Sequence, residues 1–458
     1  MRTSRSLSAP MPRRPEGPVP EIRPFRALRF AASSVGDLAA VVAPPYDVID
    51  EAERERLLAR HPDNVVRLDL PSDADGDAPD DRYRRAARTL AAWRSSGVLH
   101  KDPHPSIYIY QQDYRVPGTD VERSQRGFFG RLRLEPFGPG SGVLPHERTL
   151  SGPKEDRYKL LRATGVNTSP VVGLFGVSDD DVDRRLAAWT DGMPDIDVID
   201  DDRVRHRLWA VPADGDLAEE VAALTAAAGT GSITIADGHH RYETALRYRD
   251  ERRMSRSCEE DPAFDYVLML LLPVGWGTLT VLPTHRLVRD LDDDVAAALL
   301  EQAGRFFEIE RHVPAERLRS AFDAAGLEAG GRGRFGLWTR AGGALLSARR
   351  AAFDPYLPAG HDALRRLDVV LLGVALDQLL GIGVEAVAGG AVAYTKSVAE
   401  ALDRVDSATD GTSAAFLLEP TPVSSIMAVA ADGDVMPQKS TYFYPKALTG
   451  LVINPHEW

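Results

Sequence analysis

The stretch ITIADGHHRYETAL, residues 233–246, carries the clearest structural signal in this sequence. Its first four residues are apolar or β-branched and predict the buried end of a strand. The Asp237-Gly238 pair then predicts a tight turn, because glycine accepts backbone angles that other residues avoid. The residues from His239 onward predict a helix. The block therefore indicates a strand, a turn and a helix in immediate succession.

The start of this predicted helix presents an electrostatic conflict. Backbone N–H groups at a helix start lack partners within the helix and, together with the helix dipole, attract anions. The imidazoles of His239 and His240 and the guanidinium of Arg241 are disfavoured there unless something negative lies nearby. A bound phosphate resolves the conflict. The alternative is that Asp237 only caps the helix and that both histidines are packed or solvated.

Outside this block, predicted helices alternate with predicted strands. NVVRLDLP at 64–71 is expected to be a strand, and two alternating segments within 106–134 predict a hairpin. The remaining elements expected before residue 290 are helices at 51–60, 81–96, about 154–164 and 215–228, and strands at 265–274 and 278–288.

A second region begins near residue 290, where the pattern changes. The first twenty residues carry Arg, Ser and Pro without an apolar core and predict a disordered tail. The sequence thus predicts an α+β protein with a tail at 1–20, one domain at 21–289 and a C-terminal α+β domain at 290–458. Within that last domain we expect helices at 293–304, 314–324 and 361–379, and strands at 333–339 and 344–350.

Composition excludes several classes of protein. The 458 residues carry 68 acidic against 55 basic side chains, a net charge of −13, which argues against a nucleic-acid partner. A single cysteine excludes Cys-rich zinc and iron–sulfur sites and fits a reducing compartment. The longest apolar runs, 267–274 and 369–376, are too short to span a bilayer. We therefore expect a cytoplasmic protein without a membrane partner, and the oligomeric state stays open.

Familiar enzyme motifs are missing from the sequence. There is no P-loop, no GxGxxG after a strand, no GxSxG nucleophile elbow and no HExxH. These absences exclude the common motif-bearing classes, and whether the protein is an enzyme stays open at this point.

Other candidate site residues lie in two loops and one helix start. Glu147, in PHERTLSGPKEDRYK at 145–159, is placed to act as a general base; the alternative is a surface carboxylate. Lys154 and Arg157 follow at a predicted helix start, a second place that suits an anion; the alternative is an ordinary exposed helix start. Asp47 follows a rigid double-proline turn, and turn chemistry alone is its alternative reading.

Lysine is rare in this chain, so each lysine attracts notice. Only six of the 55 basic residues are Lys, and Lys439 and Lys446 flank the aromatic segment STYFYP. We expect this C-terminal segment, MPQKSTYFYPK at 436–446, to fold back over the pocket of the first domain, with Lys439 contacting a phosphate. The alternative is that its aromatic side chains pack only within the C-terminal domain. We also expect Lys154 to lie beside the 237–241 turn.

Five blocks of this sequence resemble a bacterial and archaeal family known as domain of unknown function family 1015. Within them, DGHHR resembles the Gly-x-(His or Arg)-Arg box of the ParB/sulfiredoxin-like superfamily, in the form found in free serine kinases. The box follows the PPYDVI loop by about 190 residues, so a large insertion must lie between them. The five blocks are VVAPPYDVI (41–49), NVVRLDLP (64–71), SGPKEDRYKLLRATGVNTSP (151–170), IADGHHRYETAL (235–246) and MPQKSTYFYPKALTGLVI (436–453).

The resemblance implies a ParB/sulfiredoxin-like core in residues 21–289 and a phosphotransferase that uses ATP or ADP with Mg²⁺. The acceptor it implies is free serine or a similar hydroxylated metabolite. A nucleotide-binding regulatory or switch protein without turnover is the alternative. The roles it implies are donor-phosphate binding by Gly238, His239, His240 and Arg241, Mg²⁺ or water positioning by Asp237, proton acceptance by Glu147 or Asp47, and binding of a substrate carboxylate or phosphate by Lys154 and Arg157.

Overall fold

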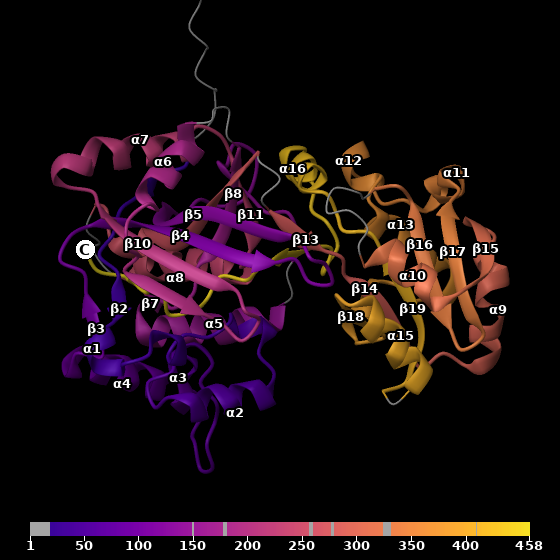
Figure 1. Cartoon of the computed structure of the whole chain (residues 1–458), viewed down its shortest axis with the longest axis horizontal. Helices are drawn as coiled ribbons and strands as arrows, with labels where there is room; N and C mark the ends of the chain where they lie inside the picture. The colour runs from indigo at the N-terminus through magenta and orange to yellow at the C-terminus, as the bar shows by residue number, and fades with distance from the viewer. Residues whose placement is uncertain are drawn as a thin grey trace, which may run out of the picture.

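The computed structural model describes residues 19–148, 151–176, 181–255, 260–275, 279–323, 331–408 and 410–458. Within these residues the chain builds a large mixed sheet and a smaller antiparallel sheet, which lie next to each other along the long axis of the molecule (Figure 1). The tail predicted at 1–20 lies outside the described residues up to residue 18, as does the single cysteine. The described residues therefore form a mixed α/β protein with two main sheets.

The large sheet forms the body of the N-terminal region. Its strands pair mostly antiparallel, but β11 runs parallel to β6 and β12 runs parallel to β8. The hairpin predicted within 106–134 is confirmed by the pairing of β4 with β5. In sheet order, the strands among the described residues are β6 (Val143–Leu144), β11 (Ile233–Asp237), β8 (Val171–Gly176), β12 (Tyr266–Val274), β5 (Glu122–Arg133), β4 (Ser106–Arg115), β10 (Arg205–Pro212) and β9 (Ile196–Ile199), with β1 (Ile22–Arg23) beside β5.

Burial explains the composition of the central strand. Eight of the nine residues of β12, YVLMLLLPV, are buried, because both faces of this strand are covered. One face packs on α6, α7 and α8 through side chains such as Leu186, Leu224 and Tyr242. The helices of this region are α1 (Ala32–Val35), α2 (Glu51–Arg60), α3 (Val66–Asp69), α4 (Asp81–Ser96), α5 (Ser151–Thr164), α6 (Asp181–Trp189), α7 (Ala218–Ala228) and α8 (His239–Ser255).

The smaller sheet is antiparallel throughout the described residues. Its strands are, in order, β15 (Phe307–Val313), β17 (Gly342–Ala348), β16 (Arg334–Thr339), β19 (Thr412–Leu418), β14 (His285–Arg289) and β18 (Val392–Thr395). The helices after residue 290 are α9 (Asp293–Ala303), α10 (Ala315–Phe322), α11 (Arg350–Phe353), α12 (Asp362–Arg365), α13 (Asp368–Leu380), α14 (Val384–Ala388), α15 (Val398–Ser407) and α16 (Val423–Ala431).

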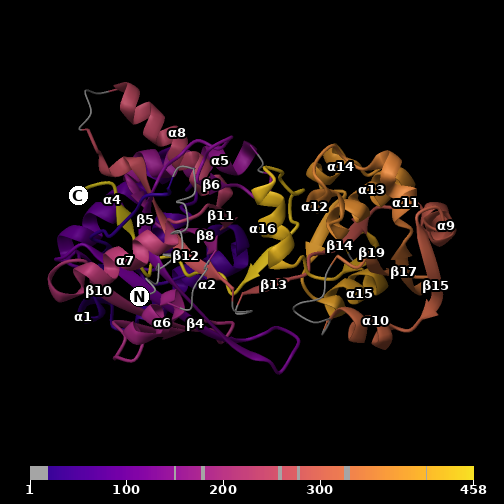
Figure 2. The same cartoon turned by 90° about the horizontal axis from the view of Figure 1, so that it is seen from above.

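The two sheets share one continuous hydrophobic core. A single cluster of buried side chains includes Tyr108 and Leu270 from the large sheet and Phe335 and Phe416 from the small one. The helix α16 lies between the two sheets in both views (Figure 1 and Figure 2). Its buried Ile426 belongs to the same cluster. Packing of this extent holds the two regions against each other and makes a site between them possible.

The C-terminal segment returns to the large-sheet region after the second sheet is complete. β20 (Tyr442–Tyr444) pairs with β13 (Thr280–Leu282), and β21 (Asn454–Pro455) pairs with β7 (Val166–Asn167). A further antiparallel pair joins β2 (Leu28–Phe30) to β3 (Leu99–Lys101). The last seventeen residues therefore contact the N-terminal region, although the domain boundary predicted at residue 290 assigns them to the second domain.

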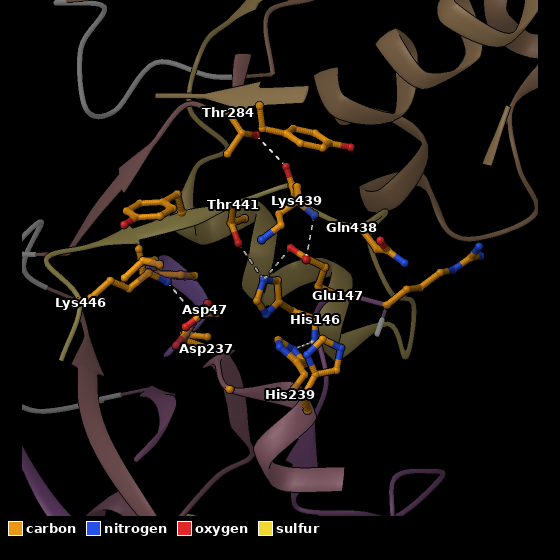
Figure 3. A pocket seen from close by; sticks show the side chains of 18 of the residues that line it. Asp47, His146, Glu147, Asp237, His239, Thr284, Gln438, Lys439, Thr441 and Lys446 are labelled. Carbon is orange, nitrogen blue, oxygen red and sulfur yellow. Dashed lines mark hydrogen bonds and ion pairs between the residues drawn. The ribbon is translucent and has the colours of Figure 1, made fainter. Parts of the chain in front are cut away.

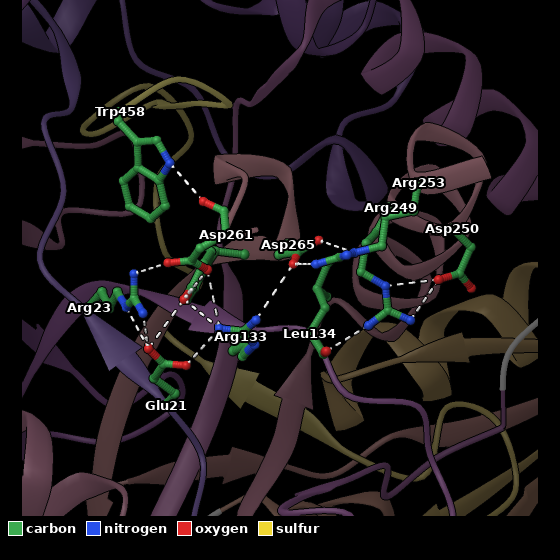
Figure 4. Close-up of polar contacts among 11 residues, drawn as sticks. Glu21, Arg23, Arg133, Leu134, Arg249, Asp250, Arg253, Asp261, Asp265 and Trp458 are labelled. Carbon is green, nitrogen blue, oxygen red and sulfur yellow. Dashed lines mark hydrogen bonds and ion pairs between the residues drawn. The ribbon is translucent and has the colours of Figure 1, made fainter. Parts of the chain in front are cut away.

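A network of ion pairs and hydrogen bonds lies where the two ends of the described chain meet (Figure 4). Arg23 on β1 pairs with Asp261 at 2.5 Å, and Arg133 on β5 pairs with Glu21 at 2.9 Å. The indole of Trp458 donates to the carbonyl of Asp261 at 3.0 Å. These side chains are about one-third exposed or more, so each pair contributes little alone and the network acts mainly to fix the termini.

Three expectations about secondary structure are wrong, and one strand was not expected. The single strand expected at 278–288 is two strands in different sheets, β13 (Thr280–Leu282) and β14 (His285–Arg289). NVVRLDLP does not form a strand: the side chain of Asn64 accepts from the N–H of Val66 at 3.0 Å and donates to the carbonyl of Ala40 at 2.8 Å, which starts the short helix α3. The charged strand β15 went unpredicted. The helix expected at 361–379 is two helices, α12 and α13, separated by a break. No helix among the described residues is both long and apolar enough to cross a membrane.

Candidate active site

A cavity of about 500 Å³ lies where the large sheet, the small sheet and the returning C-terminal segment meet (Figure 3). The DGHHR turn forms one wall, and the loop after β6 forms a second. The small sheet supplies a third wall through the ends of β14 and β18, and the C-terminal segment closes the fourth. The lining residues are Tyr46, Asp47, Val48, His146, Glu147, Arg148, Ala236, Asp237, Gly238, His239, His240, Arg241, Thr284, Tyr394, Thr395, Lys396, Gln438, Lys439, Thr441, Tyr442, Phe443 and Lys446.

The strand, turn and helix predicted from DGHHR form as expected. β11 ends at Asp237, and α8 begins at His239, with the carbonyl of Gly238 accepting from the N–H of Tyr242 at 3.0 Å. Gly238 has φ of +85°, and a Cβ there would come within 3.0 Å of the Arg241 guanidinium. Glycine is thus needed at this turn for both its backbone angle and its lack of a side chain.

Asp237 lies between two cations. Its Oδ1 accepts from the Lys446 ammonium at 2.8 Å, and its Oδ2 accepts from the Arg241 guanidinium at 2.7 Å. Burial alone would raise the pKa of Asp237, but Lys446 and then Arg241 outweigh it and hold that pKa well below its usual range. Burial would lower the pKa of Lys446, and Asp237 raises it instead. The carboxylate is therefore ionised and binds the C-terminal segment to the DGHHR turn.

The histidines at the helix start are neutral rather than cationic. His146 must donate from Nδ1 to the Ile235 carbonyl, so its Nε2 accepts from Thr441 at 2.9 Å. Its backbone N–H donates to Nε2 of His239 at 3.3 Å, which leaves the His239 proton on Nδ1. Burial lowers the pKa of His146 to about 4 and holds the pKa of His239 well below its usual value. The electrostatic conflict inferred from the sequence is thus relieved without an anion.

His240, the second histidine of the box, also lines the cavity. Burial lowers its pKa, while the nearby carboxylate of Glu243 acts in the opposite direction. Its position at the helix start gives it access to a ligand in the cavity.

Glu147 is a carboxylate of the site whose pKa is raised. Its two oxygens accept from the backbone N–H groups of Lys439, at 2.8 Å, and Ser440, at 3.2 Å. Burial nevertheless raises the pKa of Glu147 to about 7. Lys439 has φ of +55°, which is uncommon for a residue with a side chain, and the carboxylate holds that turn in place. A carboxylate with this pKa exchanges a proton readily near neutral pH.

The double-proline loop brings Asp47 to the cavity and leaves Arg157 outside it. Asp47 lies exposed in the short 3₁₀ helix Tyr46–Val48 and lines the cavity. Arg157 is buried, with its guanidinium 4.1 Å from the ring centre of Tyr46 and 2.5 Å from the Asp69 carbonyl. Arg157 therefore does not line the cavity, where the substrate contact was predicted for it. Its guanidinium instead contacts the Tyr46 ring and the Asp69 carbonyl.

Lys154 lies beside the DGHHR helix, as predicted, but not in the cavity wall. Its ammonium pairs with Glu243 of α8 at 2.8 Å. Helices α5 and α8 pack against each other, and the charge of Lys154 acts on the pKa of His240. The two helix starts are neighbours, and Lys154 reaches the site through Glu243.

The C-terminal segment does fold back over the cavity. Lys439, Tyr442 and Lys446 line it, and the ring of Tyr442 has Lys446 at 4.5 Å on its face and Lys396 at 4.0 Å. Lys396, which also lines the cavity, was not expected in the site. The rarity of lysine was the usable signal, since three of the six lysines line this cavity.

A comparison with protein-family models decides the family. The model described as "Protein of unknown function (DUF1015)" matches residues 22–370. The chain belongs to this family. The family resemblance found in the sequence blocks is thereby confirmed.

Comparisons with other proteins add no functional information. A search of curated proteins finds no match to this DUF1015 protein. Among solved structures, it is similar to a conserved hypothetical protein from Pyrococcus furiosus (12% identity, TM-score 0.32, covering 66% of this chain and 87% of the other). It is also similar to a free serine kinase in complex with AMP (12%, 0.34, 66% and 83%) and to C-terminally truncated SbnI from Staphylococcus aureus (10%, 0.32, 68% and 83%). TM-scores this low carry no conclusion about function.

The cavity of this DUF1015 protein is rich in positive charge, although the chain as a whole is acidic. Five cationic side chains line it against three carboxylates, and one of those carboxylates, Asp237, is held by two of the cations. The cations are Arg148, Arg241, Lys396, Lys439 and Lys446, and the carboxylates are Asp47, Glu147 and Asp237. An anionic ligand would balance this excess.

The metal role predicted for Asp237 does not fit this arrangement. Both of its oxygens are engaged by cations, so a metal ion would have to displace Lys446 or Arg241. Among the described residues, no group of three or more His, Cys, Asp or Glu side chains is placed to hold a metal. Asp237 is instead the anchor of the C-terminal segment.

Proposed function

We propose that this DUF1015 protein is a small-molecule phosphotransferase that binds a nucleotide donor at the DGHHR turn. Free serine or a similar hydroxylated metabolite is the acceptor, and ATP or ADP is the donor. A ParB/sulfiredoxin-like core formed by the large sheet is part of this proposal. The observation that carries it is a cationic cavity that opens on a helix start and contains a carboxylate whose pKa is about 7.

The donor phosphates fit the side of the cavity formed by the turn. The start of α8 and the ammonium groups of Lys396 and Lys439 line the same cavity, and a helix start favours an anion through its dipole. Gly238 lets a phosphate approach the backbone closely, and His239 and His240 offer ring N–H groups as neutral donors. A volume of about 500 Å³ lies within the range of cofactor sites.

Glu147 is the proposed base. In the transfer step, the acceptor oxygen forms a bond to phosphorus while the bond from phosphorus to the nucleotide oxygen breaks. The proton of the acceptor hydroxyl passes to the Glu147 carboxylate, whose raised pKa suits proton acceptance near neutrality. Asp47, on the opposite wall, is the second candidate for this role. A base in the cavity favours turnover over a regulatory switch.

Magnesium is the expected partner of a nucleotide donor, but Asp237 is not its ligand in this arrangement. Both oxygens of Asp237 accept hydrogen bonds from cations, and the role proposed for Asp237 is to hold Lys446 beside the turn. The residues of the chain carry the remaining steps: they bind the phosphates, orient the acceptor and accept its proton.

The experiment is a binding measurement followed by product analysis. ATP and ADP, each with Mg²⁺, are titrated calorimetrically into the wild type, into Lys439→Met and into the control Arg340→Met. Arg340 is exposed in the turn between β16 and β17, far from the cavity wall. Loss of the Lys439 charge should weaken nucleotide binding by about 10-fold or more, the scale of a charge-assisted hydrogen bond. The control should bind like the wild type.

Incubation with hydroxy amino acids and mass spectrometry then separate the two functions. Phosphorylated product supports the phosphotransferase. Tight nucleotide binding without product from any acceptor supports the regulatory alternative. The absence of nucleotide binding by the wild type contradicts both.

A further inference from the structure

A second hollow, of about 320 Å³, meets the main cavity at Glu147, Arg148 and His239. These three residues line both spaces, so the proposed base stands at their junction. Apolar side chains form part of the wall of the hollow, and Glu243 lies on its helix side. The residues that line it are Phe137, Pro145, Glu147, Arg148, His239, Glu243 and Val435.

The backbone around Arg148 is fixed by the C-terminal segment. The N–H of Arg148 donates to the Met436 carbonyl at 3.1 Å, and the N–H of Met436 donates to the His146 carbonyl at 2.8 Å. Residues 146–148 are thus paired like a strand with the segment that also holds Val435. This pairing holds Glu147 and Arg148 at the junction of the two spaces.

Arg148 is, with Lys396 and Lys439, one of three cations lining the main cavity that no carboxylate of the described residues pairs with. Among the residues that the structure describes, no carboxylate is paired with its guanidinium, whereas Arg241 and Lys446 share Asp237. The side chain is exposed at the rim of both spaces. A guanidinium matches a carboxylate in shape and charge and binds it through paired hydrogen bonds.

Phosphoryl transfer needs the donor and the acceptor on opposite sides of the phosphorus atom. A nucleotide in the main cavity, with its phosphates at the DGHHR turn, leaves the acceptor to approach from beyond Glu147. The hollow occupies that direction and is large enough for a small metabolite. The base then lies between the acceptor hydroxyl and the donor.

We infer that this hollow is the acceptor subsite and that Arg148 binds a carboxylate on the acceptor. The inference rests on the proposed function and narrows it: the acceptor is a hydroxylated carboxylic acid. Arg148 is the specificity residue, and the apolar wall of Phe137, Pro145 and Val435 limits the size of the acceptor. Lys154 and Arg157, expected from the sequence to bind this carboxylate, are engaged elsewhere.

Four matched compounds test this inference: serine, glycerate, serinamide and glycerol. The first two carry a carboxylate and the last two do not. Steady-state transfer is measured for wild type, Arg148→Met, Arg148→Lys and the control Arg340→Met, together with nucleotide affinity. We expect the wild type to prefer the carboxylates in kcat/KM by about 10-fold or more, the scale of a charged hydrogen-bonded pair. Arg148→Met should lose that preference through KM, and Arg148→Lys should restore part of it.

Calorimetry with the same four compounds on protein saturated with ADP separates this inference from the proposed function. If no compound is phosphorylated, the proposed function fails, and a carboxylate preference that depends on Arg148 still supports the subsite. A preference that persists in Arg148→Met, or equal binding of all four compounds by the wild type, overturns the subsite. A fall in nucleotide affinity alone in Arg148→Met also overturns it, because Arg148 then contacts the donor.

Discussion

Replacing Lys446 with Met removes the ion pair that joins the C-terminal segment to the DGHHR turn. The ammonium lies 2.8 Å from Asp237, and the side chains of both residues are less than one-fifth exposed. Removing one partner of a buried pair costs roughly 3–5 kcal/mol when the other charge is left uncompensated. Asp237 keeps Arg241 at 2.7 Å, so we expect a smaller loss in the free energy of unfolding, about 2 kcal/mol.

Urea unfolding at pH 7 measures this loss, and two comparisons make it specific. The surface pair Lys159–Asp80 also lies at 2.8 Å but is more than one-third exposed, so Lys159→Met should lower the free energy of unfolding far less than Lys446→Met does. The double variant Lys446→Met with Asp237→Asn should lose less than the sum of the single variants, because both single variants break the same Lys446–Asp237 pair, while Arg241 loses its carboxylate partner wherever Asp237→Asn is present. Strict additivity to about 0.5 kcal/mol would refute the reasoning, since the two groups would not be coupled.

The pH dependence of this pair follows from the directions of both pKa shifts. Asp237 has a lowered pKa, so its contribution is present above its ordinary value of 3.8 and is lost as pH falls below that value. Lys446 has a raised pKa, so its contribution is present below its ordinary value of 10.5 and is lost as pH rises above it. The difference between wild type and Lys446→Met should therefore stay level between about pH 4 and pH 10. A difference that changes steeply near pH 7 would contradict the assignment.

Three further predictions concern the site. Because Glu147 accepts a proton only when ionised, and its pKa in the protein without ligand is raised to about 7, kcat/KM should rise from acid to alkaline pH with a midpoint near 7. Glu147→Gln should abolish transfer at every pH, and a variant that keeps the wild-type profile rules out this base. Gly238→Ala should weaken nucleotide binding and lower the stability, because φ is +85° at this residue and the added Cβ would lie 3.0 Å from the Arg241 side chain. Calorimetry measures the binding and thermal unfolding measures the stability. Wild-type affinity together with wild-type stability would contradict the need for glycine at this position. Lys396→Met should weaken nucleotide binding by about 10-fold without changing the free energy of unfolding, since Lys396 is exposed at the cavity rim. An unchanged affinity would show that the smaller sheet does not contribute a residue to the donor site.

The local parts of the site were predictable because short-range rules govern them. An Asp-Gly pair between an apolar run and a helical pattern specifies β11, the turn at Gly238 and α8, and the structure has all three. The helices at 51–60 and 81–96 begin and end where the periodicity indicated. In each case, the residues that decide the conformation lie within a few positions of one another.

The errors arose where a side chain bonds to backbone that is distant in sequence or where charge masks a strand. Asn64 binds the carbonyl of Ala40 and so converts an expected strand into the start of α3. β15 has the sequence FEIERHV, and four of its seven side chains are exposed, so it lacks an apolar signal.

The chemistry of the site depends on contacts that sequence spacing cannot reveal. Asp237 and Lys446 are 209 positions apart, so the sequence could not show that the residue expected from the resemblance to position Mg²⁺ or a water is paired with a lysine. His239 was counted as a cation, but burial beside His146 keeps it neutral. The positive charge available to an anion therefore comes from the lysines and Arg148 rather than from the histidines, and only the fold brings these cations together.

The measurement that tests the central claim most directly is ³¹P NMR of the purified protein with Mg²⁺, serine and either ATP or ADP, recorded over time beside Glu147→Gln. The account predicts that the wild type produces a phosphomonoester signal while the donor is converted to the nucleotide with one phosphate fewer. Glu147→Gln should bind the donor and leave its signals unchanged. Donor signals that stay constant with the wild type, for serine and for glycerate alike, would contradict the assignment of this cavity to phosphoryl transfer.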